Sequence, residues 1–179
     1  MNFLKRFLSS LALSSIAFAM AFTEVAGAAD PIKIGMTVSS QGRFALAAQS
    51  GERGLKIWIN DVNSRGGISI NGQKRKIELV SLDDRSDKAM VPRVYETLIK
   101  EKGVDILFGP FGSTLTGAAA NTTEQFDKFL MIWSASSDAI YEQGYKYVVS
   151  GSQIAASRMS HPSIRALKAV GVKSIAFAY

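Results

Sequence analysis

Apolar residues follow two alternating patterns along the chain, short unbroken runs and longer stretches with helical spacing. The runs predict strands over 32–38, 77–82, 104–108, 129–133 and 145–149, and the last residues predict the start of a sixth over 173–179. Helical spacing predicts helices that end near Asn63 and before Gly103, and further helices over 113–126 and 154–170. This alternation favours an α/β, Rossmann-like parallel sheet with helices on both faces.

A tight turn and a basic cluster lie together in the first half of the chain. Asn71-Gly72, between Ile68 and Ile77, predicts a hairpin because both residue types tolerate the positive φ angles of such turns. Lys74-Arg75-Lys76 follows directly, in a chain whose net charge is +6. We interpret this cluster as a solvated hairpin edge and expect no nucleic-acid partner, because no aromatic residues are interleaved for base stacking.

The first thirty residues have the pattern of an export signal. Lys5 and Arg6 precede an apolar run over 7–22, and small residues over 26–29 follow it. This order predicts a signal peptide over 1–28, cleaved after Ala28 or Ala29. An uncleaved membrane anchor is the alternative, but the run is short of the roughly 20 residues that a span needs. After cleavage we expect no stable membrane insertion, and residues 29–179 are long enough for one domain.

The chain has no cysteine, which excludes disulfides, thiolate metal sites and thiol nucleophiles. It also excludes lipid attachment at an N-terminal cysteine. An exported protein without a lipid anchor stays near its cell only where an outer membrane retains it. We therefore expect the periplasm of a Gram-negative cell.

Three loops follow predicted strands and would lie at the edge of the sheet where ligands bind in parallel α/β folds. They span Ser39–Ser50, Gly109–Thr114 and Ser134–Asp138, and all are rich in small residues and hydroxyl groups. None carries a histidine, a paired carboxylate or a lysine placed as a base. The pattern favours holding a small polar molecule over transforming it, and we expect no cofactor and no catalytic residue.

Within these loops, Ser113 lies where a helix begins, so free N–H groups and the helix dipole favour an anion there. The alternative is that Ser113 or Thr114 caps the helix. In the third loop, hydroxyl oxygens and the Ala135 carbonyl can accept hydrogen bonds from an ammonium group. Here the alternative is a polar turn in which Ser137 caps the next helix.

Other polar residues have structural interpretations. Asp83 and Asp84 end a strand but lack the alternating ligands of a calcium loop, so we expect them to cap or to pair with Arg85. His161 is the only histidine, lies beside Pro162 at a helix start and is expected at the surface. Nucleotide-binding glycine motifs and the Gly-x-Ser-x-Gly nucleophile motif are absent from the sequence.

Taken in this order, the motifs resemble those of type I periplasmic binding proteins of the leucine/isoleucine/valine-binding family. The matching segments are 32–35, 61–68 with its Asn-x-x-Gly-Gly-Ile signature, 82–84, Gly109-Pro110 before Ser113-Thr114, and 130–132 before the serine loop. The resemblance covers residues 31–179. It implies the substrate-binding component of an ABC importer, with a branched-chain or related amino acid or amide as ligand and a membrane permease as partner.

The resemblance also assigns roles to single residues. Ser113 and its N–H match the group that binds the ligand carboxylate, and we expect Thr114 beside it to be a further ligand-binding residue. The Ala135 carbonyl matches the acceptor of the ammonium, and Ser137 matches a hydroxyl contact. Phe44 is the one aromatic residue of the first loop that is able to cover the ligand, while Trp133 either narrows the pocket or belongs to the core.

The family has a second lobe that closes on the ligand, and we expect this chain to be a fragment truncated before it, which alone binds weakly or not at all. A ligand-sensing ectodomain and an exported α/β hydrolase-like enzyme are the alternative functions. A hydrolase would depend on His161.

Overall fold

In a computed structural model, which describes residues 29–176, five strands form one sheet. The order across the sheet is β4-β1-β5-β6-β7, and every neighbouring pair is parallel. The strands are β1 (Ile32–Thr37), β4 (Ile77–Leu82), β5 (Ile106–Phe108), β6 (Leu130–Ile132) and β7 (Val148–Ser150). The predicted parallel α/β fold is confirmed, and the first five predicted strands are present. The predicted signal peptide lies outside the described residues.

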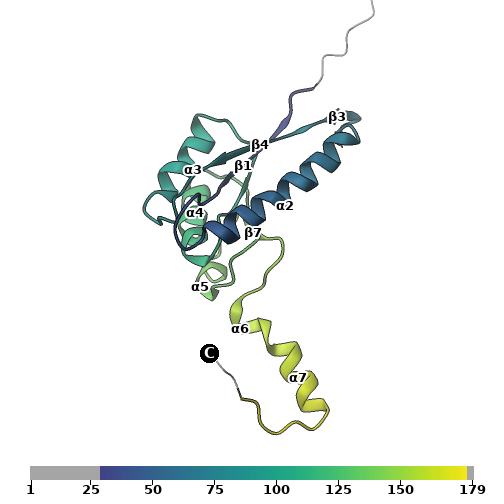
Figure 1. The fold of residues 1–179 in the computed structure, drawn as a ribbon, viewed down its shortest axis with the longest axis vertical. Coiled ribbons are helices and arrows are strands. Elements are labelled where there is room, and N and C mark those ends of the chain that lie inside the picture. The colour runs from purple at the N-terminus through teal and green to yellow at the C-terminus, as the bar shows by residue number, and fades with distance from the viewer. Residues whose placement is uncertain (1–28, 177–179) are drawn as a thin grey trace, which may run out of the picture.

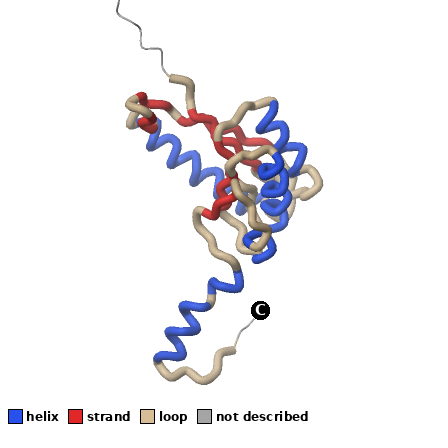
Figure 2. The backbone as a smooth tube through the Cα atoms, turned by 180° about the vertical axis from the view of Figure 1, so that it is seen from behind, coloured by secondary structure: helices blue, strands red, loops and turns tan. Residues whose placement is uncertain are grey.

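Three helices cover the two faces of this sheet, as Figures 1 and 2 show from opposite sides. Helix α2 (Ala45–Ser64) lies on one face, and α3 (Val91–Lys100) and α4 (Ser113–Gln125) lie side by side on the other. Pro92 lies in the first turn of α3, where its missing N–H has no helical partner to lose. The prediction of helices on both faces is confirmed.

Apolar side chains fill the layer on each side of the sheet. The smaller cluster joins Ile59 of α2 to Ile34 and Ile77 of the sheet. The larger cluster lies under α3 and α4, where runs of small residues let α4 approach the strands closely. Its buried members are Val91, Tyr95, Leu98, Val104, Leu107, Leu115, Ala118, Ala119, Ala120 and Leu130.

The predicted hairpin is present as β2 (Ile68–Ile70) paired antiparallel with β3 (Gln73–Arg75). Asn71 and Gly72 have φ angles of 50° and 81°, as the tight turn requires. The Asn63 amide ties the end of α2 to β4, since it donates to the Ile77 carbonyl and accepts from the Ile77 N–H, each at 2.8 Å. The asparagine of the sequence signature therefore serves the fold.

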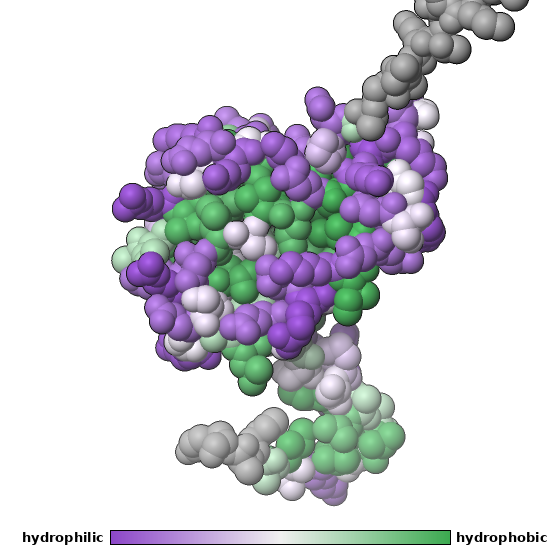
Figure 3. Space-filling model, turned by 45° about the horizontal axis from the view of Figure 1, so that its top comes forward, coloured by the Kyte–Doolittle hydropathy of each residue, from purple (hydrophilic) through white to green (hydrophobic). Residues whose placement is uncertain are grey.

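Beyond β7, residues 151–176 leave the sheet; residues 151–157 keep hydrogen bonds to residues 132–138, and the residues after them project from the body (Figure 1). The segment 151–176 carries α6 (Ala156–Met159) and α7 (His161–Ala169). The prediction of one helix over 154–170 is wrong in its continuity, because Pro162 lies in the first turn of α7 and has no N–H to bond to a preceding turn. The residues of α7 are all exposed, and Figure 3 shows apolar residues at the surface of this segment as well as on the body.

The predicted sixth strand is also wrong as far as the structure describes it. Residues 172–176 form neither strand nor helix, and 177–179 lie outside the described residues. A strand needs a neighbour for its backbone hydrogen bonds, whereas this segment lies away from the sheet edge at β7 (Figure 1). Among residues 29–176, no helix is both long enough and apolar enough to cross a membrane.

Candidate ligand-binding site

The strand order brings the three polar loops together at one edge of the sheet. Connections run to one side from β1 and to the other side from β5, so the loops after these neighbouring strands diverge at this edge, the place where open α/β sheets bind ligands. The serine loop follows β6, the next strand along. A hydrogen bond from the Gly112 N–H to the Ser134 carbonyl at 2.8 Å joins the second loop to the third.

Ser113 connects these two loops through its side chain. Its hydroxyl oxygen accepts hydrogen bonds from the N–H groups of Ser136 and Ser137, each at 3.1 Å. Gly112, with a φ of 85°, holds the N-cap position of α4, and no side chain caps the helix there. The capping alternative for Ser113 and Thr114 is therefore wrong. Because these two bonds fix the Ser113 oxygen, its hydroxyl hydrogen remains free to donate. This hydroxyl lies beside the first N–H groups of α4, which have no carbonyl partner within the helix.

Ala135 and Ser137 lie across from Ser113 in the serine loop. Ala135 is 1% exposed, and its carbonyl accepts a hydrogen bond from the Tyr141 hydroxyl at 2.7 Å. A carbonyl oxygen has two lone pairs, so one acceptor position is left. Ser137 stands at the N-cap position of α5 (Asp138–Tyr141), yet its hydroxyl makes no capping hydrogen bond. The structure thus brings Ser113, Ala135 and Ser137 together and does not use the Ser137 hydroxyl as a cap.

Phe44 reaches the same edge from the first loop. Its ring lies over Gly112, where a Cβ atom would be 3.5 Å from the ring. It also lies 5.9 Å, centroid to centroid, from Phe111. Thr114 is exposed on the first turn of α4. Phe44 is therefore a direct neighbour of the start of α4, while Thr114 lies at the surface of its first turn.

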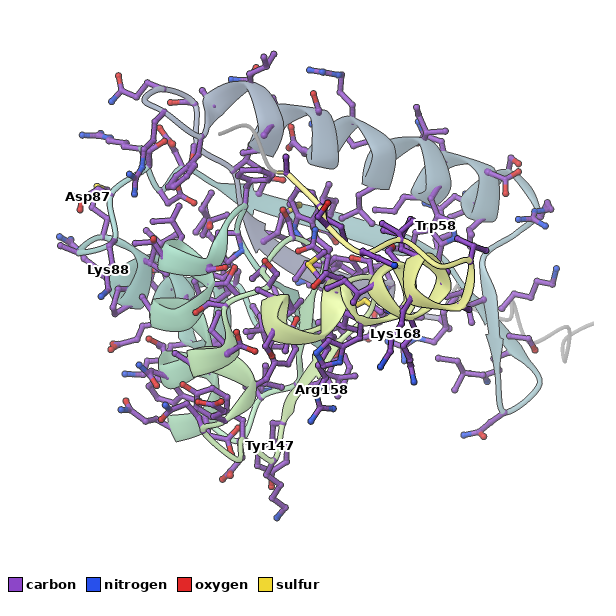
Figure 4. All side chains as sticks on the ribbon, turned by 90° about the horizontal axis from the view of Figure 1, so that it is seen from below. Trp58, Asp87, Lys88, Tyr147, Arg158 and Lys168 are labelled. Carbon is purple, nitrogen blue, oxygen red and sulfur yellow. The ribbon has the colours of Figure 1, made fainter. Side chains whose placement is uncertain are left out.

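A polar cavity of about 330 Å³ opens beside the start of α4. Three of the five predicted residues line it, namely Ser113, Thr114 and Ser137, whereas Phe44 and Ala135 do not. Lys88, on the loop before α3, lines it too and is labelled in Figure 4. Sequence reasoning missed Lys88. The loop after β4 also follows a parallel strand and therefore lies at the same carboxyl edge. That position was the signal by which Lys88 could have been predicted as a site residue.

The aspartates that end β4 anchor the first loop. Asp84 is fully buried, and its carboxylate accepts from the hydroxyls of Thr37 and Ser39 at 2.6 and 2.5 Å. Asp83 accepts from the N–H and hydroxyl of Ser40 and from the N–H of Arg85. Burial raises the pKa of Asp83, but these hydrogen bonds outweigh it and leave that pKa lowered. The structural interpretation holds, with Arg85 contributing its backbone.

A family model described as "Periplasmic binding protein" matches residues 31–179, the whole of the fold just described. The chain belongs to the periplasmic binding protein family. The resemblance seen in the sequence motifs is confirmed.

Individual relatives agree with this family. The chain is 29% identical to Leu/Ile/Val-binding protein homolog 8 of Brucella suis over 138 residues. This alignment covers 77% of this chain and 31% of that protein. It superposes on the branched-chain amino acid transporter substrate binding protein LivJ of Streptococcus pneumoniae, solved with isoleucine, with a TM-score of 0.61 and 28% identity, over 68% of this chain and 33% of that one. An ABC transporter substrate-binding protein of Desulfitobacterium hafniense shares the fold, with a TM-score of 0.65, 19% identity and coverage of 79% and 39%. The chain spans about a third of the length of these relatives.

In this periplasmic binding protein, the residue that a hydrolase would require lies far from the serine loops. His161 is exposed at the start of α7, in the segment that stands away from the body (Figure 1). Within residues 29–176, no group of three or more histidine, aspartate or glutamate side chains is arranged to hold a metal. The described site therefore offers hydrogen-bond donors and acceptors for a ligand, and the family binds solutes without enzymatic chemistry.

Proposed function

We propose that this chain forms the first ligand-binding lobe of the substrate-binding component of an ABC importer. Its ligand is a branched-chain or related amino acid or amide, captured in the periplasm of a Gram-negative cell and delivered to a membrane permease. Family membership, the Leu/Ile/Val-binding name of the Brucella relative and the predicted signal peptide support this proposal.

The observation that carries the proposal is the fixed hydroxyl of Ser113. Two N–H groups of the serine loop hold its oxygen, so its hydrogen is left to donate to a carboxylate. The first N–H groups of α4, a helix of 13 residues, point the same way and favour an anion. Lys88 and Thr114 add polar groups at the rim. The ligand carboxylate is therefore assigned to the start of α4.

The amino end of the ligand is assigned to the serine loop. The Ala135 carbonyl has one acceptor position beyond its bond to Tyr141, and the Ser137 hydroxyl supplies a second oxygen. Hydrogen bonds to a charged group contribute about 1.5–3 kcal/mol each. Phe44, over Gly112, covers the ligand from the side of α2.

Calorimetric titration of leucine, isoleucine, valine and their amides into protein expressed from the complete gene tests the proposal. We expect Ser113→Ala to weaken binding about tenfold or more, because it removes a hydrogen bond to the charged carboxylate. Ser64→Ala is the matched control, since the Ser64 hydroxyl donates to Asp61 at the far end of α2 and the change should leave affinity unaltered. Absence of binding by any of these ligands, or equal affinity of Ser113→Ala and the unmodified protein, contradicts the proposal.

A further inference from the structure

Three aromatic rings from three different loops form a row along the carboxyl edge of the sheet. The ring centroids of Phe44 and Phe111 are 5.9 Å apart, and those of Phe111 and Trp133 are 5.8 Å apart. Both pairs are tilted, by 56° and 55° between ring planes. These values lie within the range in which aromatic rings attract each other edge to face. The three residues are called the aromatic row below.

The far end of the aromatic row is held rigidly. The indole N–H of Trp133 donates to the Gly109 carbonyl at 2.6 Å, so its one polar atom is satisfied. On the other side, the backbone of α2 lies directly against the ring, because a Cβ atom at Gly51 would come within 2.2 Å of it. Only a glycine at position 51 lets the indole take this place. Trp133 is therefore preorganised before any ligand arrives.

The near end of the aromatic row adjoins the proposed carboxylate site. Phe111 is separated from Ser113 by Gly112 alone, and the Phe44 ring lies over Gly112. The three rings are half-buried, whereas the side chains of the hydrophobic core around α3 and α4 are buried. Neither Phe111 nor Trp133 belongs to a described core cluster. The row therefore lies beside the start of α4 with part of each ring left accessible, and Phe44 also packs against the cluster under α3 and α4.

We propose that the aromatic row makes this site prefer carboxylates that carry a flat ring, with or without an α-amino group, over carboxylates with a saturated side chain of similar size. This inference rests on the proposed function, since it places the ligand carboxylate at Ser113. A flat ring attached to that carboxylate extends the row by one further edge-to-face contact. A saturated ring of the same size offers similar apolar area but no such contact. A preference for the flat ring therefore distinguishes aromatic contacts with the row from nonspecific burial of apolar surface.

Matched pairs of ligands test the inference by calorimetry on protein expressed from the complete gene. The pairs are benzoate with cyclohexanecarboxylate, and phenylalanine with cyclohexylalanine. We expect the flat ring of each pair to bind roughly three- to tenfold more tightly, the range that one aromatic contact supplies. Only phenylalanine and cyclohexylalanine carry an α-amino group. Tighter binding of this pair than of the benzoate pair would show that the amino group contributes to binding.

Variants then assign the preference to the row. Phe111→Leu and Phe44→Leu keep apolar bulk but remove a ring, and each should bring the two members of a pair to nearly equal affinity. Phe129→Leu is the matched control, because Phe129 precedes β6 at the opposite edge of the sheet and is 40% exposed. Trp133 serves as a reporter in a Trp58→Phe background, where it is the only tryptophan, Trp58 being the exposed indole on α2 in Figure 4. Ring ligands should change its fluorescence.

The possible outcomes separate this inference from the proposed function. A flat-ring preference that Phe111→Leu abolishes and Phe129→Leu preserves supports the aromatic row. Equal binding of flat and saturated rings, with Ser113→Ala still weakening all four ligands, overturns the row and leaves the carboxylate site standing. Binding of none of the four ligands, with leucine, isoleucine and valine also silent, overturns both.

Discussion

The Asp84 side chain has no access to solvent, and its carboxyl oxygens accept hydrogen bonds from hydroxyl and backbone N–H groups. It accepts from Thr37, Ser39 and the N–H of Ser86, and so fixes the end of β1 and the start of the loop that leads to Phe44. Its neighbour Asp83 makes hydrogen bonds of similar length but is exposed. Each aspartate accepts three hydrogen bonds, so the main difference between them is burial.

This difference predicts unequal costs of the same substitution. Asp84→Ala leaves two buried hydroxyls without their partner and should lower the free energy of unfolding by about 3 kcal/mol, since each buried unsatisfied group costs about 1–3 kcal/mol. Asp83→Ala should cost less than about 1 kcal/mol because water replaces the lost acceptor. Urea unfolding followed by circular dichroism measures both. Equal losses for the two variants would show that burial does not govern the role of Asp84.

At the scale of elements, the segment after β7 is attached to the serine loop at successive points. The Gly151 N–H donates to the Ile132 carbonyl, and the Ser152 hydroxyl donates to the Trp133 carbonyl. The Ala156 N–H donates to the Ser136 carbonyl. The last point is Asp138, whose carboxylate accepts from the N–H and hydroxyl of Ser157. The loop that carries Ala135 and Ser137 is therefore coupled directly to the start of α6.

The Ser157 hydroxyl is the main cause of a lowered pKa at Asp138, below the ordinary aspartate value of 3.8. A carboxyl whose pKa is lowered by folding stabilises the fold above its ordinary pKa and loses this contribution as the pH falls through the lowered value. We expect an NMR titration of Asp138 to give a pKa below 3.8 in the unmodified protein and a higher one in Ser157→Ala. Ser163→Ala, on exposed α7, should leave it unchanged. A titration curve that Ser157→Ala does not move would rule out this coupling.

At the scale of the whole molecule, the chain consists of a packed body and a projecting segment. The body buries its core on both sides of the sheet, while α7 presents Ile164 and Leu167 to solvent, and Val170 directly after it has 77% of its surface exposed. Figure 3 shows this apolar surface below the body. The chain spans about a third of its relatives, and a helix with no buried contacts contributes little stability of its own.

Hydrogen exchange should reveal this division. In the 179-residue chain, we expect amides of α7 to exchange orders of magnitude faster than those of α4 and β5, because local opening of α7 breaks no core contacts. Mass spectrometry of peptides over 156–176 and 113–125 provides the comparison. Protection of α7 equal to that of α4 in this chain would contradict the prediction.

The sequence by itself determined the parallel α/β fold, the hairpin at Asn71-Gly72 and the three loops of the site. These depend on local periodicity and turn chemistry, which short stretches of sequence contain. It also placed Ser113 and Ser137 together, through the family resemblance. It did not reveal the lack of a strand over 172–176, because a strand depends on a neighbour that the pattern of one segment does not specify.

Only the tertiary structure decided how the site is assembled. It showed that Ser113 bonds the serine loop instead of capping α4, that Tyr141 takes one acceptor position of Ala135, and that Lys88 reaches the cavity. It also aligned Phe44 and Phe111 with Trp133, residues up to 89 positions apart in the chain. Such contacts arise from strand order and helix placement, which bring distant residues together at one edge of the sheet, and no local pattern records that proximity.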